Sequence, residues 1–169
     1  MVGIPLPARS LEIHFPELPP SDNHIRVHRR QGGEVYSKKA EEYRSNFRAH
    51  VQKQYFLPVQ KFVQGHTPAS AYRLCIVFYF ETLVNEGWLK VDRAGKRGAK
   101  SVYKKMDAGN RRKLIEDCLA DALGLDDSLT MELTLVKAMD PVHPRVVLYL
   151  QEVSPADFGI PPAFLTGIT

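Results

Sequence analysis

The sequence predicts an α+β fold, a single domain with a mixed four-stranded sheet that carries helices on one face. A chain of 169 residues is long enough to bury a hydrophobic core without disulfides. Apolar residues recur with strand or helix periodicity in the order strand, helix, strand, helix, strand, strand. One mixed sheet with covered apolar stripes is the simplest arrangement that buries them, so the predicted core spans about 11–153 of a domain that covers 1–169.

The first part of the chain predicts one strand and one helix. The segment Leu11 to Phe15 reads LEIHF and alternates apolar with polar residues, as a half-buried strand does. Residues 17–36 have the prolines, glycines and polar residues of a loop. Ser37 is a suitable N-cap for a helix that runs to about Tyr55, and Pro58 is expected to stop it.

The middle of the chain predicts a central strand followed by a long basic insertion. Ala71 to Phe80 is apolar on nearly both faces, which is typical of a strand inside a sheet. Residues 82–105 are rich in Gly, Lys and Arg and lack periodicity, so we expect a loop, with a small hairpin around Trp88 to Val91 as one arrangement open to it.

The last part predicts a helix and two strands. The helix runs from about Asn110 to Leu123, and Gly124 supplies the left-handed closing position. Leu129 to Lys137 and Arg145 to Val153 are predicted as strands, paired most simply with each other in antiparallel fashion. Residues 154–169 form an irregular tail.

Composition indicates a cytoplasmic protein. Cys75 and Cys118 lie in apolar periodic segments without metal-ligand spacing, as reduced core thiols do. The N-terminus does not resemble a signal peptide, and no apolar run approaches the ~20 residues of a membrane span, so we expect no membrane partner. Because no phosphate-binding loop or dinucleotide motif occurs, we expect no small-molecule cofactor.

Charge is distributed unevenly along the chain. The net charge is +4 and the isoelectric point is about 9.1. Residues 24–53 and 82–105 each carry a net charge of +5, whereas residues 106–127 carry −3. The two basic segments therefore flank one acidic segment, a pattern that favours a polyanionic partner.

The acidic segment has two interpretations. Its carboxylates could be helix caps and, at Glu116, Asp117 and Asp121, a solvated helix face with ion pairs such as Lys113 with Asp117. Alternatively, carboxylates beside a lysine are the minimum equipment for metal-assisted phosphodiester hydrolysis. The helix is roughly 20 Å long, so its acidic ends can meet only if the chain runs back along it or if a dimer assembles the site.

Three pieces of the sequence resemble the RusA family of Holliday junction resolvases. LPPSDNH at Leu18 to His24 and YSKKAEEYR at Tyr36 to Arg44 are similar to the N-terminal signature of that family. MDAGNRRKLIEDCLADALGLDDS, from Met106 to Ser128, is similar to its catalytic segment. The resemblance covers roughly Leu18 to Leu150.

The resemblance implies a catalytic and metal-binding set around the second helix. Lys113 takes the place of the essential lysine, and Asp107 and Asp127 those of the principal metal ligands. Asp126 supports them, and Asn110 stands at the motif asparagine. The implied cofactor is Mg²⁺, with Mn²⁺ as a possible substitute.

One position departs from the family pattern. Gly109 stands where the family has a second aspartate, so Asn110, Asp117 or water must fill the gap, or activity is weakened. The departure keeps open a non-catalytic protein that binds branched DNA. A metal-dependent nuclease that acts on flaps or single strands is a third alternative.

The resemblance also implies the substrate and the assembly. The expected activity is paired cutting of four-way DNA junctions in recombination and repair, by a bacterial or prophage homodimer whose twofold symmetry matches two symmetric nicks. The basic segments supply the candidate phosphate contacts, and residues 90–105 as a whole are a further candidate region. The DNA-binding candidates are Arg26, Arg29, Arg30, Lys104, Lys105, Arg111 and Arg112.

Overall fold

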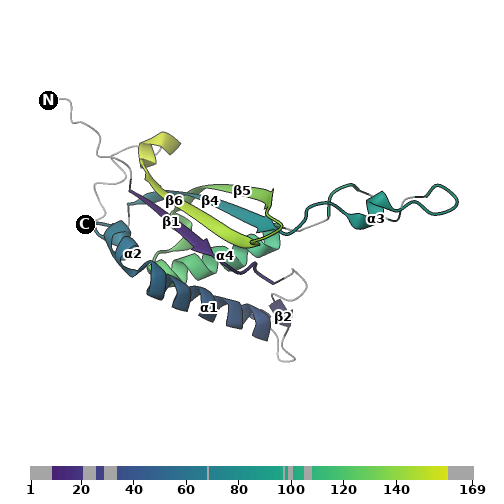
Figure 1. Ribbon diagram of the computed structural model, residues 1–169. Coiled ribbons are helices and arrows are strands. Elements are labelled where there is room, and N and C mark those ends of the chain that lie inside the picture. Colours follow the sequence, from purple (N-terminus) through teal and green to yellow (C-terminus); the bar gives the residue numbers. More distant parts are fainter. Residues whose placement is uncertain are drawn as a thin grey trace.

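The computed structural model describes residues 9–20, 26–28, 34–67, 69–96, 98, 101–104 and 108–159. Its main sheet has the strand order β1 (Ser10–Phe15), β6 (Arg145–Val153), β4 (Ala71–Phe80) and β5 (Thr130–Met139). Helices α1 (Lys38–Gln54), α2 (Phe56–Val63) and α4 (Ala108–Leu123) lie on one side of it (Figure 1). The predicted mixed four-stranded sheet with helices on one face is confirmed.

The predicted pairing of the last two strands is wrong. β4 lies between β5 and β6, parallel to the former and antiparallel to the latter. The long connection through α4 allows the parallel β4–β5 pair. The short turn after Met139 can still reach β6, because passing one strand requires only about 10 Å and five residues can span about 16 Å.

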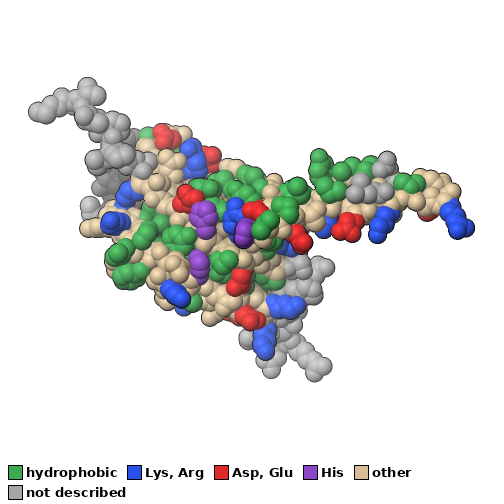
Figure 2. Space-filling model, in the orientation of Figure 1, with side chains coloured by type: hydrophobic (Ala, Val, Ile, Leu, Met, Phe, Trp, Pro, Cys, Tyr) green, Lys and Arg blue, Asp and Glu red, His purple; other side chains and the backbone are tan. Residues whose placement is uncertain are grey.

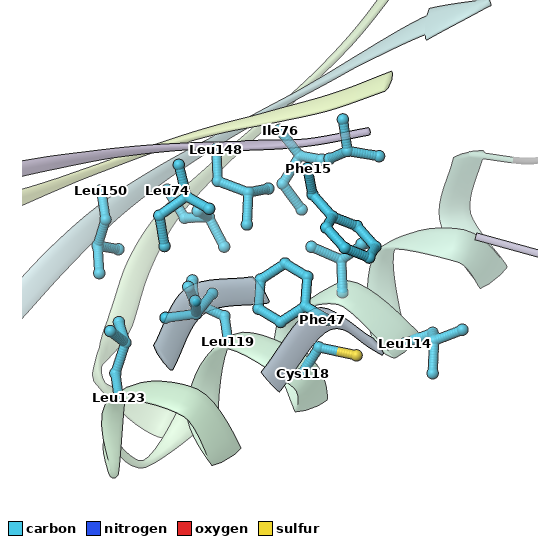
Figure 3. Close-up of a cluster of buried hydrophobic side chains, with 14 of the residues drawn as sticks. Phe15, Phe47, Leu74, Ile76, Leu114, Cys118, Leu119, Leu123, Leu148 and Leu150 are labelled. Carbon is cyan, nitrogen blue, oxygen red and sulfur yellow. The ribbon is translucent and has the colours of Figure 1, made fainter. Parts of the chain in front are cut away.

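The core fills the space between the sheet and the two long helices (Figure 3). From the sheet, Phe15, Ile76 and Leu148 face the helices, and all three are at most 2 % exposed. From α1, Phe47 packs edge-on against Phe15 with ring centroids 5.1 Å apart. The predicted apolar faces of the helices are therefore confirmed, including the buried thiol of Cys118.

The helix predicted up to Tyr55 is followed at once by a second one. α1 begins after Ser37, whose hydroxyl accepts a hydrogen bond from the Ala40 N–H, and ends at Gln54. Pro58 does not stop helical structure but lies in the first turn of α2, where an amide hydrogen has no intrahelical acceptor.

The segment predicted as a loop before α1 contains a small antiparallel ribbon. β2 (Arg26–His28) pairs with β3 (Glu34–Tyr36), with Arg26 opposite Tyr36. Three-residue strands are too short to show a period, so composition alone indicated a loop.

The basic insertion forms an arm that projects from the body (Figure 1). Residues 86–89 are a short helix, α3 (Glu86–Leu89), so the hairpin considered around Trp88 is wrong in detail. The chain turns instead at Asp92 to Lys96, where the Asp92 N–H donates to the Lys96 carbonyl at 2.9 Å. At the far end of the chain, the predicted irregular tail begins with a 3₁₀ helix, η3 (Pro155–Phe158).

Within the described ranges, no helix combines the length and the apolar character needed to cross a membrane.

Candidate active site

The acidic segment folds back on itself at the end of α4. Gly124 has φ +66°, and its N–H donates to the Ala120 carbonyl at 2.8 Å. The Leu125 N–H donates to the same carbonyl at 3.2 Å. These two hydrogen bonds, with Gly124 in the left-handed conformation, close the C-terminus of α4. The chain then returns beside the helix through a 3₁₀ turn, η2 (Asp127–Leu129).

Lys113 joins the two parts of this segment. Its ammonium lies 2.6 Å from Asp127 Oδ2 and 3.0 Å from Asp117 Oδ1. Lys113 lies in the first half of α4 and Asp127 follows its end, so the chain runs back along the helix as far as Lys113. The metal interpretation needs the return to reach Asp107, which lies outside the described residues. The predicted ion pair of Lys113 with Asp117 is also present.

Asp117 is held from a second side by the N-terminal ribbon. The Tyr36 hydroxyl at the end of β3 donates a hydrogen bond to Asp117 Oδ2. The guanidinium of Arg44 lies over the Tyr36 ring, 4.8 Å from its centroid, and also pairs with Asp121. Tyr36 was not among the predicted site residues, although it opens the YSKKAEEYR stretch that resembles the family signature.

Glu116 is less exposed than the predicted solvated helix face implies. Its side chain is only 12 % exposed, and its Oε2 lies 3.1 Å from Arg112 Nε. With Asp126 and Asp127 it lines a cleft of about 20 Å³, roughly the space of one water molecule. Asp121 stays at the surface, as expected.

Asp126 shapes the return of the chain. Its Oδ1 accepts the Ser128 N–H at 2.8 Å and caps η2. Hydrogen bonds from Ser128 favour the charged form of Asp126 and lower its pKa below the ordinary value. Asp126 therefore presents the following residue, Asp127, toward Lys113.

The structure describes only some of the predicted DNA-binding and metal-binding residues. Arg111 Nη1 donates to the Pro19 carbonyl at 3.1 Å, and its guanidinium lies 5.5 Å from the Phe80 ring centroid. Lys104 is half-buried at the base of the arm. Arg26 in β2 and Asn110 in α4 are placed by their backbone alone. The other predicted members, Asp107, Arg29, Arg30 and Lys105, lie outside the described residues.

The donor chemistry fits a hard cation. Among the described residues no group of three His, Cys, Asp or Glu side chains could hold a metal ion. Asp117 and Asp127 nevertheless offer carboxylate oxygens, and neither thiol nor imidazole joins them at Lys113, which suits Mg²⁺ better than Zn²⁺.

Comparisons with known proteins bear on this arrangement. Endodeoxyribonuclease RusA is the family that matches, over residues 17–151. No curated protein matches. Among solved structures, the chain is similar to 2C-methyl-D-erythritol 2,4-cyclodiphosphate synthase from Plasmodium vivax. The two are 11 % identical over 86 % of this chain and 93 % of that one, with a TM-score of 0.30, too low to support any argument.

The family match covers most of the chain and includes the whole of the site described above. Both Tyr36 and the segment from Lys113 to Asp127 lie inside it. The chain belongs to the RusA family of endodeoxyribonucleases.

Proposed function

We propose that this protein is a Mg²⁺-dependent endonuclease that resolves four-way DNA junctions by paired phosphodiester hydrolysis, with Mn²⁺ as a possible substitute. One observation carries the proposal. Lys113 contacts both Asp117, one turn farther along α4, and Asp127, beyond the end of the helix, at 3.0 and 2.6 Å. A solvated helix face needs no such return of the chain, whereas a metal-assisted hydrolase needs carboxylates and a cation at one point.

In this proposal Asp107 and Asp127 are the principal metal ligands and Asp126 supports them. Asn110 or Asp117 fills the place that Gly109 leaves without a carboxylate. Asp117 is well suited, because the Tyr36 hydroxyl fixes one of its oxygens. A bound Mg²⁺ would supply an activated water and would stabilise negative charge on the phosphate.

Lys113 contributes a positive charge at the reacting centre. Its ammonium orients the attacking water or offsets the charge that develops as water adds to phosphorus and the bridging P–O bond breaks. Asp117 and Asp127 hold the ammonium in position, so it need not reorganise during the reaction.

The phosphate contacts proposed around this centre come from three elements. Arg26 stands opposite Tyr36 in the β2–β3 ribbon, so its backbone lies beside the residue that contacts Asp117. Lys104 ends the arm, and Arg111 and Arg112 lie in α4 just before Lys113. Arg29, Arg30 and Lys105 are proposed from the sequence alone.

A homodimer is proposed because two symmetric nicks in a nearly twofold junction need two symmetric sites. The family membership supports a role in recombination and repair, and we propose a bacterial or prophage setting for it.

Gly109 favours a second candidate, a protein that binds branched DNA without cutting it. It lies in α4 and offers no carboxylate. The fold and the basic segments serve both candidates equally, so only a cutting assay separates them.

The decisive experiment incubates the protein with a labelled mobile four-way junction, with and without Mg²⁺. We expect paired nicks only with the metal, and loss of cutting with retained binding in Asp107→Asn and Asp127→Asn. Asp121→Asn is the matched control, because that carboxylate lies on the same helix but pairs with Arg44 instead of Lys113. Binding without nicks by the unmodified protein would refute the proposed cutting of junctions, and cutting by both variants would refute the assigned ligands.

A further inference from the structure

The arm, residues 83–104, is an internally braced element. Its two limbs are joined near the base by the Lys104 N–H to the Leu83 carbonyl and by the Asn85 N–H to the Val102 carbonyl, both at 2.8 Å. Farther out, the Gly98 N–H donates to the Lys90 carbonyl at 3.2 Å. The limbs are therefore linked at several points along their length.

The tip of the arm is shaped by one aspartate. Asp92 Oδ1 accepts the N–H groups of Ala94 and Lys96, at 2.9 and 2.7 Å, and Gly95 takes a left-handed φ of +76°. This turn leaves Arg93 and Lys96 exposed, with Lys90 exposed just below them. Lys and Arg side chains accordingly occupy the outer end of the arm (Figure 2).

The surface of the arm is that of a contact element. Val91, Val102 and Tyr103 are 55, 37 and 67 % exposed, because a projecting segment has no core in which to bury them. Exposed apolar side chains beside cations on a braced element are typical of an interaction surface.

The base of the arm adjoins the candidate active site. Lys104 is separated from the first residue of α4, Ala108, by three residues, one of which is the proposed ligand Asp107. The base of the arm is therefore close in sequence to the proposed centre, and its outer end extends away from that centre.

We propose that the arm grips the phosphate backbone of a duplex leading away from the cut, with Lys90, Arg93 and Lys96 as its contacts. This inference rests on the proposed function and adds a footprint to it. From base to tip the arm reaches at most about 25 Å, counting extended residues and one helical turn. At 3.4 Å per base pair, this reach corresponds to about seven base pairs of duplex.

The proposal is tested by varying both the length of the duplex branches and the charge of the arm. Binding is measured without metal, so that no cutting intervenes, on junctions whose duplex branches are either about five or about fifteen base pairs long. The arm variant is Arg93→Ala with Lys96→Ala. Its matched control is Lys61→Ala with Arg73→Ala, which removes the same charge from exposed positions on α2 and β4, outside both basic segments.

On long branches we expect the arm variant to bind several-fold more weakly, and the slope of log affinity against log salt to fall by about two, one unit for each lost phosphate contact. On short branches it should match the control. An arm variant that equals the control on both substrates overturns the proposal. The proposal is also overturned if the arm variant binds as tightly as the unmodified protein but has a lower molecular mass in light scattering. The arm would then contact a second copy of the chain.

The outcomes separate this proposal from the proposed function. If the unmodified protein binds junctions but never cuts them, the nuclease assignment fails, and the arm is still judged by its length-dependent salt slope. If the unmodified protein binds no DNA, both fail.

Discussion

Lys113 is the residue on which the catalytic interpretation depends. Its two ion pairs are both partly exposed, with side-chain exposures of 42 % for the lysine and 48 % for Asp127. Pairs of that exposure contribute at most about 1 kcal/mol to stability. A large effect of this residue on cutting would therefore be chemical and not structural.

Replacing Lys113 with Gln should lower the cutting rate about a hundredfold, the usual loss when one preorganised stabilising group is removed. The free energy of unfolding should change by less than about 1 kcal/mol. Single-turnover cutting at saturating protein and a denaturation curve measure the two effects. Lys61→Gln, an exposed substitution in α2, serves as control. A variant that cuts normally would remove Lys113 from the mechanism.

At the scale of elements, the return of the chain at Gly124 positions Asp126 and Asp127. A Cβ at this glycine would meet nothing within 4 Å, so any penalty comes from the backbone conformation alone. The return itself was foreseeable only as one of two alternatives, because helix periodicity fixes where α4 ends but not the path that follows.

Gly124→Ala should therefore cost about 1–2 kcal/mol and lower the melting temperature by roughly 2–8 °C. Cutting should also fall, since strain at the turn displaces Asp127 from Lys113. Gly65→Ala is the matched control, because Gly65 follows α2 with a φ of +78° and lies outside the site. Similar destabilisation with normal cutting is expected there. Equal losses of cutting in the two variants would contradict the positioning role.

The elements that sequence predicted well have long apolar stripes. Buried residues of α1 and α4 recur every three or four positions, and β4 is apolar on both faces. The predicted pairing of β5 with β6 was wrong, because their sequence pattern identifies them as strands but does not identify the neighbour of each strand in the sheet. Tyr36 was missed as a site residue, since its hydrogen bond to Asp117 spans 81 positions and leaves no local signal.

At the scale of the whole molecule, several separate carboxylates tie elements together and should set the response to acid. Arg9 pairs with Glu152 at 2.5 Å and lowers the pKa of that carboxyl. In the β5–β6 turn, a hydrogen bond from Arg145 and the N–H groups of His143 and Val142 lower the pKa of Asp140 to about 2. Each of these groups favours the folded state when ionised.

Stability should consequently hold above the unfolded pKa of Asp, about 3.9, and decline as the pH falls toward 2. Because its folded pKa is the lower one, Asp140 contributes fully above about pH 4 and loses its contribution as it becomes protonated. In Asp140→Asn this part of the acid dependence should disappear, so the variant and the unmodified protein should converge in stability near pH 2. Urea unfolding at a series of pH values measures the free energy of unfolding of both proteins. Parallel curves at all pH values would contradict the assigned pKa.

The bridge made by Lys113 has a consequence for the order of assembly. Many acidic metal sites are repulsive until their ion arrives, and such domains fold only when loaded. Here an ammonium already stands between Asp117 and Asp127, so their mutual repulsion is offset while the chain folds. In the proposed nuclease, folding and metal loading would therefore be separate events, and the protein would adopt its shape before the ion binds.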